Sequence, residues 1–453
     1  MTAPPLLTIV LAAGKGTRMK SAHPKALHRV AGLSMLGHVL AAAEVAGSDQ
    51  IAVVVGPDMD AVETEALARA PRAKVFLQRE QQGTAHAVLA ARAALAGYRG
   101  DVLVLVADVP LLTSASIARL RSALEAGNNV AVLGFHAADP DGYGRLLADR
   151  SGALVAIREH RDASEAERAV KFCNSGVLAF RCPDLVSLLD RIDTANAKAE
   201  YYLTDAVAIA RGDGLEAVAV ACGEDEALGI NSRDHLAAAE RIYQDRVRLR
   251  MMREGVTLTA PDTVWFSHDT RIGRDVTIEP NVFFGPGVVV EDGVVIHAHC
   301  HFWGAHIRKG AEVGPFARLR PGADIGPGVH IGNFVEVKNS TIEEGAKANH
   351  LAYVGDGRVG AGANIGAGTI LCNYDGFRKH ATDIGAGAFI GSNTSLVAPV
   401  KIGDGAYIGS GSVITKDVPA DALALERAEL RVRPGWAARF RALMSRHKTQ
   451  RPG

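Results

Sequence analysis

The chain has 453 residues, about three times the roughly 150 of a typical domain, so at least two folded units are expected. Hydrophobic residues make up 48% and charged residues 22%, which argues against disorder as the main state. Fifty basic and fifty acidic residues cancel, which excludes the overall positive charge of a general nucleic-acid binder.

The cysteines and the N-terminal segment narrow the class further. The five cysteines form no C-x-x-C pair, so neither a disulfide framework nor a zinc ribbon is expected. The apolar stretch from Leu6 to Ala13 is too short to cross a bilayer and follows no basic residue, so we expect no stable membrane insertion and no secretory signal. These features favour a cytoplasmic enzyme.

Residues 1–231 alternate apolar, β-rich runs with alanine-rich helical ones, which predicts an α/β domain with a mostly parallel, Rossmann-like sheet. Strands are expected at Leu6–Ala12, Ile51–Val55, Val75–Leu77, Val102–Val106 and Val130–Leu133. Helices are expected at His38–Ala46, Met59–Ala70, His86–Leu95 and Ser114–Ala126.

A glycine turn follows the first predicted strand, in the segment from Leu11 to Met19. At the end of a parallel strand, such a turn presents backbone N–H groups to an anion, and phosphate is the expected guest. The segment lacks the P-loop pattern, and Met19 occupies the third glycine position of a dinucleotide fingerprint. Arg18 and Lys25 supply two nearby cations that can neutralise a transferring phosphoryl group.

A second apolar strand ends in Asp108. Ligands of open α/β sheets bind outside the carboxyl ends of the strands, which is where a Mg²⁺ ligand belongs. A helix cap or turn residue is the competing interpretation of Asp108, because Val-Pro follows it.

A helical, charged segment at residues 232–254 is expected to link this domain to a different architecture. Of the 48 glycines, 26 lie between Arg271 and Thr415, where an aliphatic residue recurs every six positions. This period predicts a parallel β-helix over residues 255–419, with the aliphatic residues stacked inside. The period is carried by Ile272, Ile278, Phe284, Val290 and Ile296, and again by Ile384, Ile390, Leu396, Ile402, Ile408 and Ile414.

The period breaks between Cys372 and Asp383, which predicts a loop on one face, often the binding face of a solenoid. It also falters around His350, which can therefore project from a turn and take a proton from an attacking amine.

Three alternating histidines, His297, His299 and His301, with His306 nearby, would project from one side of a strand as metal ligands do. No acidic or histidine partner is evident at a supporting spacing, so exposed surface residues are expected here instead of a zinc site. The tail at residues 420–453 is basic, with a net charge of +7 from Arg427 onward. It is interpreted as an arm that packs over the β-helix near an anionic cofactor.

The motifs of the first domain resemble those of the sugar-nucleotide pyrophosphorylases. Combined with the hexapeptide domain, the chain resembles the bacterial enzymes that join an N-acetylglucosamine-1-phosphate uridyltransferase to a glucosamine-1-phosphate acetyltransferase. The motifs that carry the resemblance are Leu11 to Met19 with Lys25, Gln78 with Gln82-Gly83-Thr84, Asp108-Val-Pro, Gly142-Tyr-Gly-Arg145, Glu159-His160, Asn174-Ser-Gly176, Glu200 to Asp205 and Gly229-Ile-Asn231.

The resemblance implies a nucleotidyltransferase domain followed by a left-handed parallel β-helix that assembles as a homotrimer. It implies UTP, acetyl-CoA, glucosamine 1-phosphate and N-acetylglucosamine 1-phosphate as substrates, and Mg²⁺ as the metal ion. Asp108 and Asn231 would hold Mg²⁺. The other uridyltransferase residues would be Arg18, Lys25, Leu11, Ala12, Ala13, Gly14, Gln78, Gly83 and Thr84 for the nucleotide, and Gly144, Glu159 and Asn174 for the sugar.

In the β-helix, the resemblance makes His350 the general base. Asn373 and Tyr374 would reach the reacting centre from a neighbouring subunit. The phosphate and sugar would be bound by Arg320, Lys338, Tyr353 and Asn364, and acetyl-CoA by Ala367, Ser392, Ser410 and Arg427. The chain departs from the family at Val106-Ala107, where Tyr-Gly is usual, and in the residue type of Ser410.

Two alternative hypotheses about function remain. In the first, a sugar-phosphate nucleotidyltransferase carries a β-helix that only assembles or regulates the oligomer. In the second, the chain is a scaffold whose glycine turn is a vestigial nucleotide sensor. Turnover of UTP separates the second reading from the enzymes, and thiol release from acetyl-CoA separates the first from a bifunctional enzyme.

Overall fold

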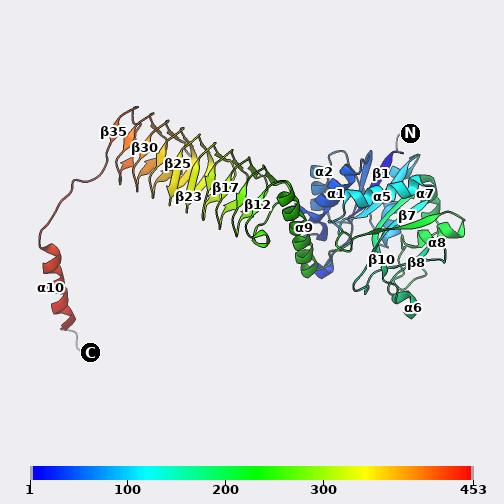
Figure 1. The fold of residues 1–453 in the computed structure, drawn as a ribbon. Helices are drawn as coiled ribbons and strands as arrows, with labels where there is room; N and C mark the ends of the chain where they lie inside the picture. The colour runs from blue at the N-terminus through cyan, green and yellow to red at the C-terminus, as the bar shows by residue number, and fades with distance from the viewer. Residues whose placement is uncertain (1–3, 450–453) are drawn as a thin grey trace. The chain divides into compact units, whose positions relative to one another are not determined.

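The computed structural model describes residues 4–449 and divides the chain into two compact units (Figure 1). The first unit comprises Met1–Arg250 with Phe266–His268, and the second comprises Met251–Trp265 with Asp269–Gly453. The helix expected between the two architectures is α9 (Arg233–Arg253), and most of it belongs to the first unit.

The first unit is built on a nine-stranded sheet whose main path runs β11-β7-β10-β6-β1-β4-β5. The strands β6, β1, β4 and β5 are parallel, as expected, and β10 runs antiparallel to both of its neighbours. The strands are β1 (Leu6–Leu11), β4 (Gln50–Val55), β5 (Lys74–Leu77), β6 (Asp101–Val106), β7 (Val130–His136), β8 (Arg145–Ala148), β9 (Leu154–Arg158), β10 (Phe172–Arg181) and β11 (Ala217–Cys222), with a small hairpin of β2 (Arg29–Val30) and β3 (Leu33–Ser34).

Helices cover both faces of this sheet because alternate residues of its central strands point to opposite sides. Leu7 and Ile9 pack with α3, α4, α7 and α8, whereas Leu6 and Val10 pack with α1, α2 and α5. The predicted helix at His86–Leu95 is two helices, because the chain turns at Ala91. The helices are α1 (Met35–Val45), α2 (Asp60–Arg69), α3 (Thr84–Ala90), α4 (Arg92–Leu95), α5 (Ser114–Glu125), α6 (Glu165–Arg168), α7 (Cys182–Leu189) and α8 (Asp205–Gly212).

The second unit is a parallel β-helix whose short strands form three ladders, as the hexapeptide period predicts. In the first ladder, Ile278, Ile296, Val313 and Ile331 are paired in register from one coil to the next, so their side chains form one buried column. Each fully buried aliphatic side chain contributes roughly 1.5–3 kcal/mol. The strands of this ladder are β12 (Thr257–Leu258), β14 (Thr277–Ile278), β17 (Val295–Ile296), β20 (Glu312–Val313), β23 (His330–Asn333), β25 (Lys347–His350), β27 (Asn364–Ile365), β30 (Phe389–Ile390), β33 (Tyr407–Ile408) and β35 (Leu423–Ala424).

The other two ladders share the longer strands β24 (Glu336–Ile342) and β26 (Tyr353–Val359), which turn the corner between them. One contains β13 (Arg271–Ile272), β16 (Val289–Val290), β19 (Ala305–Ile307), β22 (Ala323–Ile325), β29 (Thr382–Ile384) and β32 (Val400–Ile402). The other contains β15 (Phe283–Phe284), β18 (His301–Phe302), β21 (Arg318–Leu319), β28 (Ile370–Cys372), β31 (Ser395–Val397) and β34 (Val413–Ile414).

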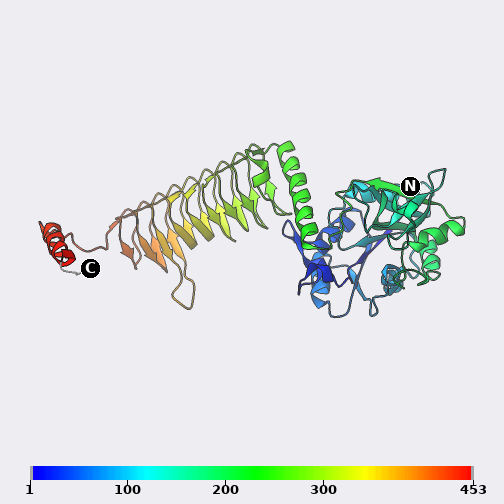
Figure 2. The ribbon, with the colours of Figure 1, turned by 90° about the horizontal axis from the view of Figure 1, so that it is seen from below.

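The predicted interruption at residues 372–383 is a loop between β28 and β29 that projects from the side of the β-helix (Figure 2). Within it, Tyr374 and Lys379 are joined by an antiparallel bridge.

The histidine segment differs from its sequence interpretation in two respects. His297 and His299 lie outside the strands β17 and β18, so the histidines do not share one strand face. The expectation that His297 lacks acidic partners is wrong, because its ring nitrogens lie 3.1 Å from Glu279 and 2.9 Å from Glu312. These carboxylates belong to the preceding and following coils, so they are distant in sequence and adjacent in space.

The basic tail contains α10 (Trp436–Thr449), and residues 450–453 lie outside the described residues. Side chains from Arg427 to Arg446 are exposed, and the packing of this arm over the β-helix stays a prediction. Within residues 4–449, no helix is both long and apolar enough to cross a membrane.

Candidate active sites

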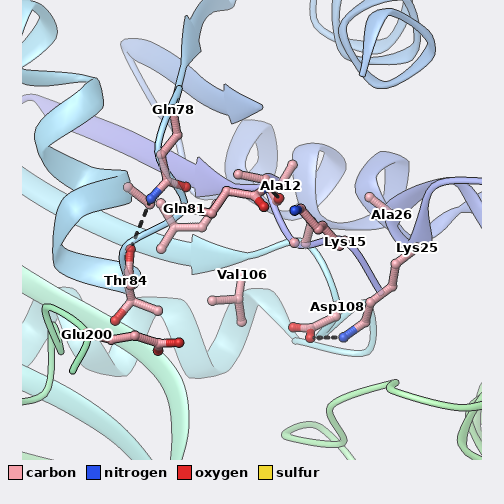
Figure 3. Close-up of a pocket in the computed structure, with 16 residues that line it drawn as sticks. Ala12, Lys15, Lys25, Ala26, Gln78, Gln81, Thr84, Val106, Asp108 and Glu200 are labelled. Atoms are coloured by element: carbon pink, nitrogen blue, oxygen red, sulfur yellow. Dashed lines mark hydrogen bonds and ion pairs between the residues drawn. The ribbon is translucent and has the colours of Figure 1, made fainter. Parts of the chain in front are cut away.

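A cavity of about 410 Å³ opens at the carboxyl ends of β1 and β6, the position at which open α/β sheets bind ligands (Figure 3). It brings together the glycine turn, the loop before α3 and the residues that end β6. Its lining consists of Leu11, Ala12, Ala13, Gly14, Lys15, Lys25, Ala26, Gln78, Gln81, Gly83, Thr84, Ala87, Val106, Ala107, Asp108 and Glu200.

Lys25 is held between two oxygen atoms from distant parts of the sequence. Its ammonium nitrogen lies 2.5 Å from Asp108 Oδ2 and 2.6 Å from Asn231 Oδ1. The amide nitrogen of Asn231 donates to the carbonyl of Gly229, which fixes the oxygen toward the lysine. Gly16 has a φ of 61°, and a Cβ there would overlap the Lys25 side chain, so glycine is required for this packing.

The oxygens of Asp108 and Asn231 fit a magnesium ion, since both already converge on one positive charge. Mg²⁺ prefers oxygen ligands and commonly takes only one or two from the protein, the rest being water and substrate phosphate. Among the described residues, no group of three or more His, Cys, Asp or Glu side chains could hold a metal ion. A site completed by substrate phosphates agrees with this donor set.

At the other side of the cavity, Gly83 and Thr84 begin α3 against the segment that contains Tyr201. A Cβ at Gly83, where φ is 114°, would lie 2.5 Å from the Tyr201 carbonyl oxygen. The hydroxyl of Thr84 accepts a hydrogen bond from the Leu203 backbone at 3.0 Å. The turn is therefore fixed before any ligand binds.

Gly144, Glu159 and Asn174, the expected sugar-binding residues, form a neighbouring cluster outside the cavity lining. The Asn174 backbone N–H donates to the Gly144 carbonyl at 2.8 Å, and a Cβ at Gly144 would lie 3.5 Å from Glu159 Oε1. Burial raises the pKa of Glu159, although Lys198 and the Thr204 hydroxyl act in the opposite direction.

Sequence reasoning did not single out three of the polar residues that line the cavity. Lys15 and Glu200 lie within the motifs that were recognised, and Gln81 donates to the carbonyl of Ala13 in the glycine turn. Gln81 thereby ties the turn to the loop before α3, a contact that sequence spacing does not reveal. Arg18 is exposed in the short 3₁₀ turn Thr17–Met19 and is not part of the lining.

In the β-helix, Lys338 and Asn373 converge on Asp356, a carboxylate that sequence reasoning missed, and the Asn373 amide also donates to the Tyr353 hydroxyl. Asp356 accepts from the Asn373 amide at 2.5 Å and lies 3.8 Å from the Lys338 ammonium. Burial alone would raise the pKa of Asp356, but the amides of Asn339 and Asn373 and the charge of Lys338 outweigh it and lower the pKa. Asn373 is buried in contacts within its own chain, whereas Tyr374 is exposed.

His350 is exposed at the end of β25, and its Nδ1 lies 2.7 Å from Asn333 Oδ1 on the preceding coil. Because the amide oxygen can only accept, this contact places the ring proton on Nδ1 and leaves Nε2 with a lone pair. Leu351 follows with a φ of 52°, which marks the turn predicted from the faltering period. Arg320 donates to Glu336 at 2.9 Å.

The residues expected to bind acetyl-CoA follow one corner through successive coils. The Asn393 N–H donates to the Ala367 carbonyl, and the Gly411 N–H donates to the Ser392 carbonyl one coil later. The Arg427 guanidinium then donates to the Ser410 carbonyl at 2.8 Å. Asn364 lies on β27, paired with Lys347 of the coil before.

Comparison with known proteins agrees with both architectures. Residues 8–177 match the MobA-like NTP transferase domain, and residues 269–302, 304–339 and 381–416 match the bacterial transferase hexapeptide (six repeats). The Bifunctional protein GlmU of Azorhizobium caulinodans is 61% identical over 98% of this chain and 99% of its own length. The proteins of the same name from Bradyrhizobium sp. and Xanthobacter autotrophicus are 59% and 58% identical, and each alignment covers at least 97% of both chains. The chain belongs to the GlmU family of bifunctional proteins.

Proposed function

We propose that the two units divide the synthesis of UDP-N-acetylglucosamine between them. The chain is a bifunctional transferase of this pathway. Its β-helix acetylates glucosamine 1-phosphate with acetyl-CoA, and its N-terminal unit transfers the uridylyl group of UTP to the resulting N-acetylglucosamine 1-phosphate. The observation that carries the proposal is Lys25, held between Asp108 and Asn231 at the edge of the cavity that Gln78 and Gly14 also line.

In the N-terminal unit, a phosphate oxygen of the sugar phosphate attacks the α-phosphorus of UTP in line, and pyrophosphate leaves. The backbone N–H groups of the glycine turn and the Lys25 ammonium neutralise the phosphates and hold them in line. Arg18, exposed on the same turn, contacts the leaving pyrophosphate. Asp108 and Asn231 would hold Mg²⁺, which when bound neutralises phosphate charge.

In the β-helix, the amine of glucosamine 1-phosphate attacks the thioester carbonyl of acetyl-CoA. A C–N bond forms, the C–S bond breaks, and coenzyme A leaves as its thiol. His350 Nε2 takes the proton that the amine loses and passes it to the leaving sulfur. This nitrogen can accept the proton because Asn333 holds the other ring nitrogen in its protonated form. Lys338, Arg320 and Tyr353 bind the substrate phosphate and sugar, with Asp356 keeping the Lys338 side chain in place.

The protein acts in the cytoplasm in this proposal, because UTP and acetyl-CoA are cytoplasmic metabolites. It assembles as a homotrimer, because the β-helix exposes a ridge of aromatic side chains. Phe316 and Phe334 stack at 5.1 Å on one corner and are about half exposed. Exposed apolar ridges of this kind are suited to a protein interface. Sedimentation equilibrium of the purified protein gives the mass, for which three chains of 47.6 kDa are expected and a monomer would reject the trimer.

The enzymatic proposal is tested by omitting one component at a time from assays of the purified protein. Thiol release from acetyl-CoA is expected only with glucosamine 1-phosphate, and pyrophosphate release from UTP only with N-acetylglucosamine 1-phosphate and Mg²⁺. Pyrophosphate release without thiol release at any sugar phosphate concentration would favour a β-helix that serves assembly only. Absence of both products would reject an enzyme altogether.

A further inference from the structure

We infer that His86 is a positioning residue that selects UTP over CTP by fixing the side-chain amide of Gln78. The inference deepens the proposed function and rests on it, because it takes the cavity to be the uridyltransferase site. It concerns three side chains: Gln78 on the loop before α3, His86 in α3, and Tyr201 on the segment opposite them.

Gln78 lines the cavity although its side chain is only 3% exposed. A buried amide needs hydrogen-bond partners within the protein. Its Nε2 donates to the Gly83 carbonyl at 3.1 Å and lies 3.3 Å from His86 Nδ1. A carbonyl oxygen can only accept, so the Gly83 contact requires the amide nitrogen, not the oxygen, at this position.

The amide of Gln78 has two N–H groups, and the Gly83 carbonyl and His86 Nδ1 accept one each. The contact requires His86 to have no proton on Nδ1, and thus the neutral ring with its proton on Nε2. The Gln78 oxygen then faces away from both contacts and toward the cavity, as Figure 3 shows for the labelled side chain. No donor from residues 4–449 is assigned to this oxygen, so it is available to a ligand.

His86 is itself held in position. Its ring stacks on Tyr201 with the centroids 6.2 Å apart and the planes inclined by 29°. The Tyr201 backbone forms two hydrogen bonds to this region. Its N–H donates to the Gln82 carbonyl at 2.8 Å, and its carbonyl accepts from the Ala85 N–H at 2.9 Å. The acceptor that orients Gln78 is therefore part of a fixed framework.

An oxygen presented in this way recognises a hydrogen-bond donor on the base. Uracil carries N3–H in the middle of its pairing edge, whereas cytosine carries an unprotonated nitrogen there, whose lone pair would face the oxygen. If the amide turned over, it would present N–H groups and favour cytosine instead. A site built to accept from a base donor discriminates against a base that lacks it, because the buried oxygen is left unpaired.

The test compares two substitutions of His86 by their KM and kcat for UTP and CTP, measured as pyrophosphate release. His86→Phe keeps a ring against Tyr201 and removes the acceptor, whereas His86→Asn keeps an acceptor near Nδ1 and removes the ring. We expect His86→Phe to raise the KM for UTP about tenfold with little change in kcat. The ratio of kcat/KM for UTP to kcat/KM for CTP should fall about tenfold as well. His86→Asn is expected to stay within about threefold of the wild type.

A double substitution identifies the residue through which His86 acts. In a Gln78→Ala background, His86→Phe should change the UTP preference no further, since the group it orients is gone. An unchanged urea unfolding transition of the N-terminal unit serves as the control for folding of each variant. Equal losses in the Phe and Asn variants, an unchanged preference in His86→Phe, or a further loss in the double variant would overturn the inference. A wild-type protein that releases no pyrophosphate from UTP would instead reject the proposed function, and this inference with it.

Discussion

The ammonium nitrogen of Lys25 lies 2.5 Å from the carboxylate of Asp108, although 83 residues separate them in the chain. The lysine follows the glycine turn after β1, and the aspartate follows the neighbouring parallel strand β6. The carboxyl ends of adjacent parallel strands meet at one edge of the sheet, so the fold itself brings this cation and this carboxylate together.

Replacing Lys25 with methionine removes this cation while keeping most of the side-chain volume. We expect kcat/KM for pyrophosphate release to fall by about 10²- to 10³-fold, because a positioned charge on the phosphates is lost. Thiol release from acetyl-CoA should be unchanged. Lys74→Met, at an exposed lysine of β5, is the matched control and should leave both activities intact. A similar loss in both variants would contradict a specific role for Lys25.

Replacing Asn333 with alanine removes the oxygen that holds the ring proton of His350 on Nδ1. We expect kcat for acetyl transfer to fall about tenfold, with the KM for glucosamine 1-phosphate nearly unchanged, since the substitution alters the base and not the phosphate contacts. Asn333→Asp keeps an acceptor and should restore most of the rate. A change confined to KM would mean that Asn333 binds substrate instead of orienting His350.

Asp205 provides a test of the N-terminal unit through pH. Burial, with help from Asp193 and Glu159, raises the pKa of Asp205 to about 6. The folded carboxyl therefore holds its proton more tightly than the unfolded one, and stability declines as the pH rises from about 4 to about 6. Asp205→Asn cannot ionise, so it should be more stable than the wild type by about 1 kcal/mol at pH 8 and equal to it at pH 4. Urea unfolding at the two pH values measures this, and a variant less stable at pH 8 would contradict it.

His297 gives a pH dependence of stability in the same direction in the β-helix, but at a higher pH. Burial alone would lower the pKa of His297, but its hydrogen bonds to Glu312 and Glu279 outweigh it and raise the pKa above 6.5. The stabilisation is present below the unfolded pKa and is lost as the pH rises through the higher folded value. His297→Gln should thus cost about 1 kcal/mol at pH 6 and little at pH 9. His306→Gln, at a histidine paired with one carboxylate, is the control for which a smaller effect is expected. A cost equal at both pH values would rule out the charged pair.

The period of six was sufficient to predict the β-helix, because each aliphatic residue stacks on its equivalent in the next coil, as Ile296 does on Val313. The same reasoning missed the partners of His297 and His350. Glu279 and Asn333 lie 18 and 17 residues before them, one full coil away, so no local spacing connects them. Polar residues at the corners contact residues one coil away. The number of residues in a coil depends on its loops and turns, so the aliphatic period alone does not identify these partners.

In the N-terminal unit, motifs located Lys25 and Asp108, but the roles of neighbouring residues depend on close packing. Gln81 contacts the carbonyl of Ala13, 68 residues away, and His86 contacts Gln78 across a turn whose shape depends on a glycine. Such contacts follow from the three-dimensional arrangement of the loops, which residue types alone do not specify.

The most direct test of the two-site account assays Asp108→Asn and His350→Ala for both products, under conditions where the wild type gives both. The account predicts that Asp108→Asn loses pyrophosphate release and keeps thiol release, and that His350→Ala shows the reverse. If either folded variant lost both activities together, the two reactions would not belong to separate sites, and the central claim would be contradicted.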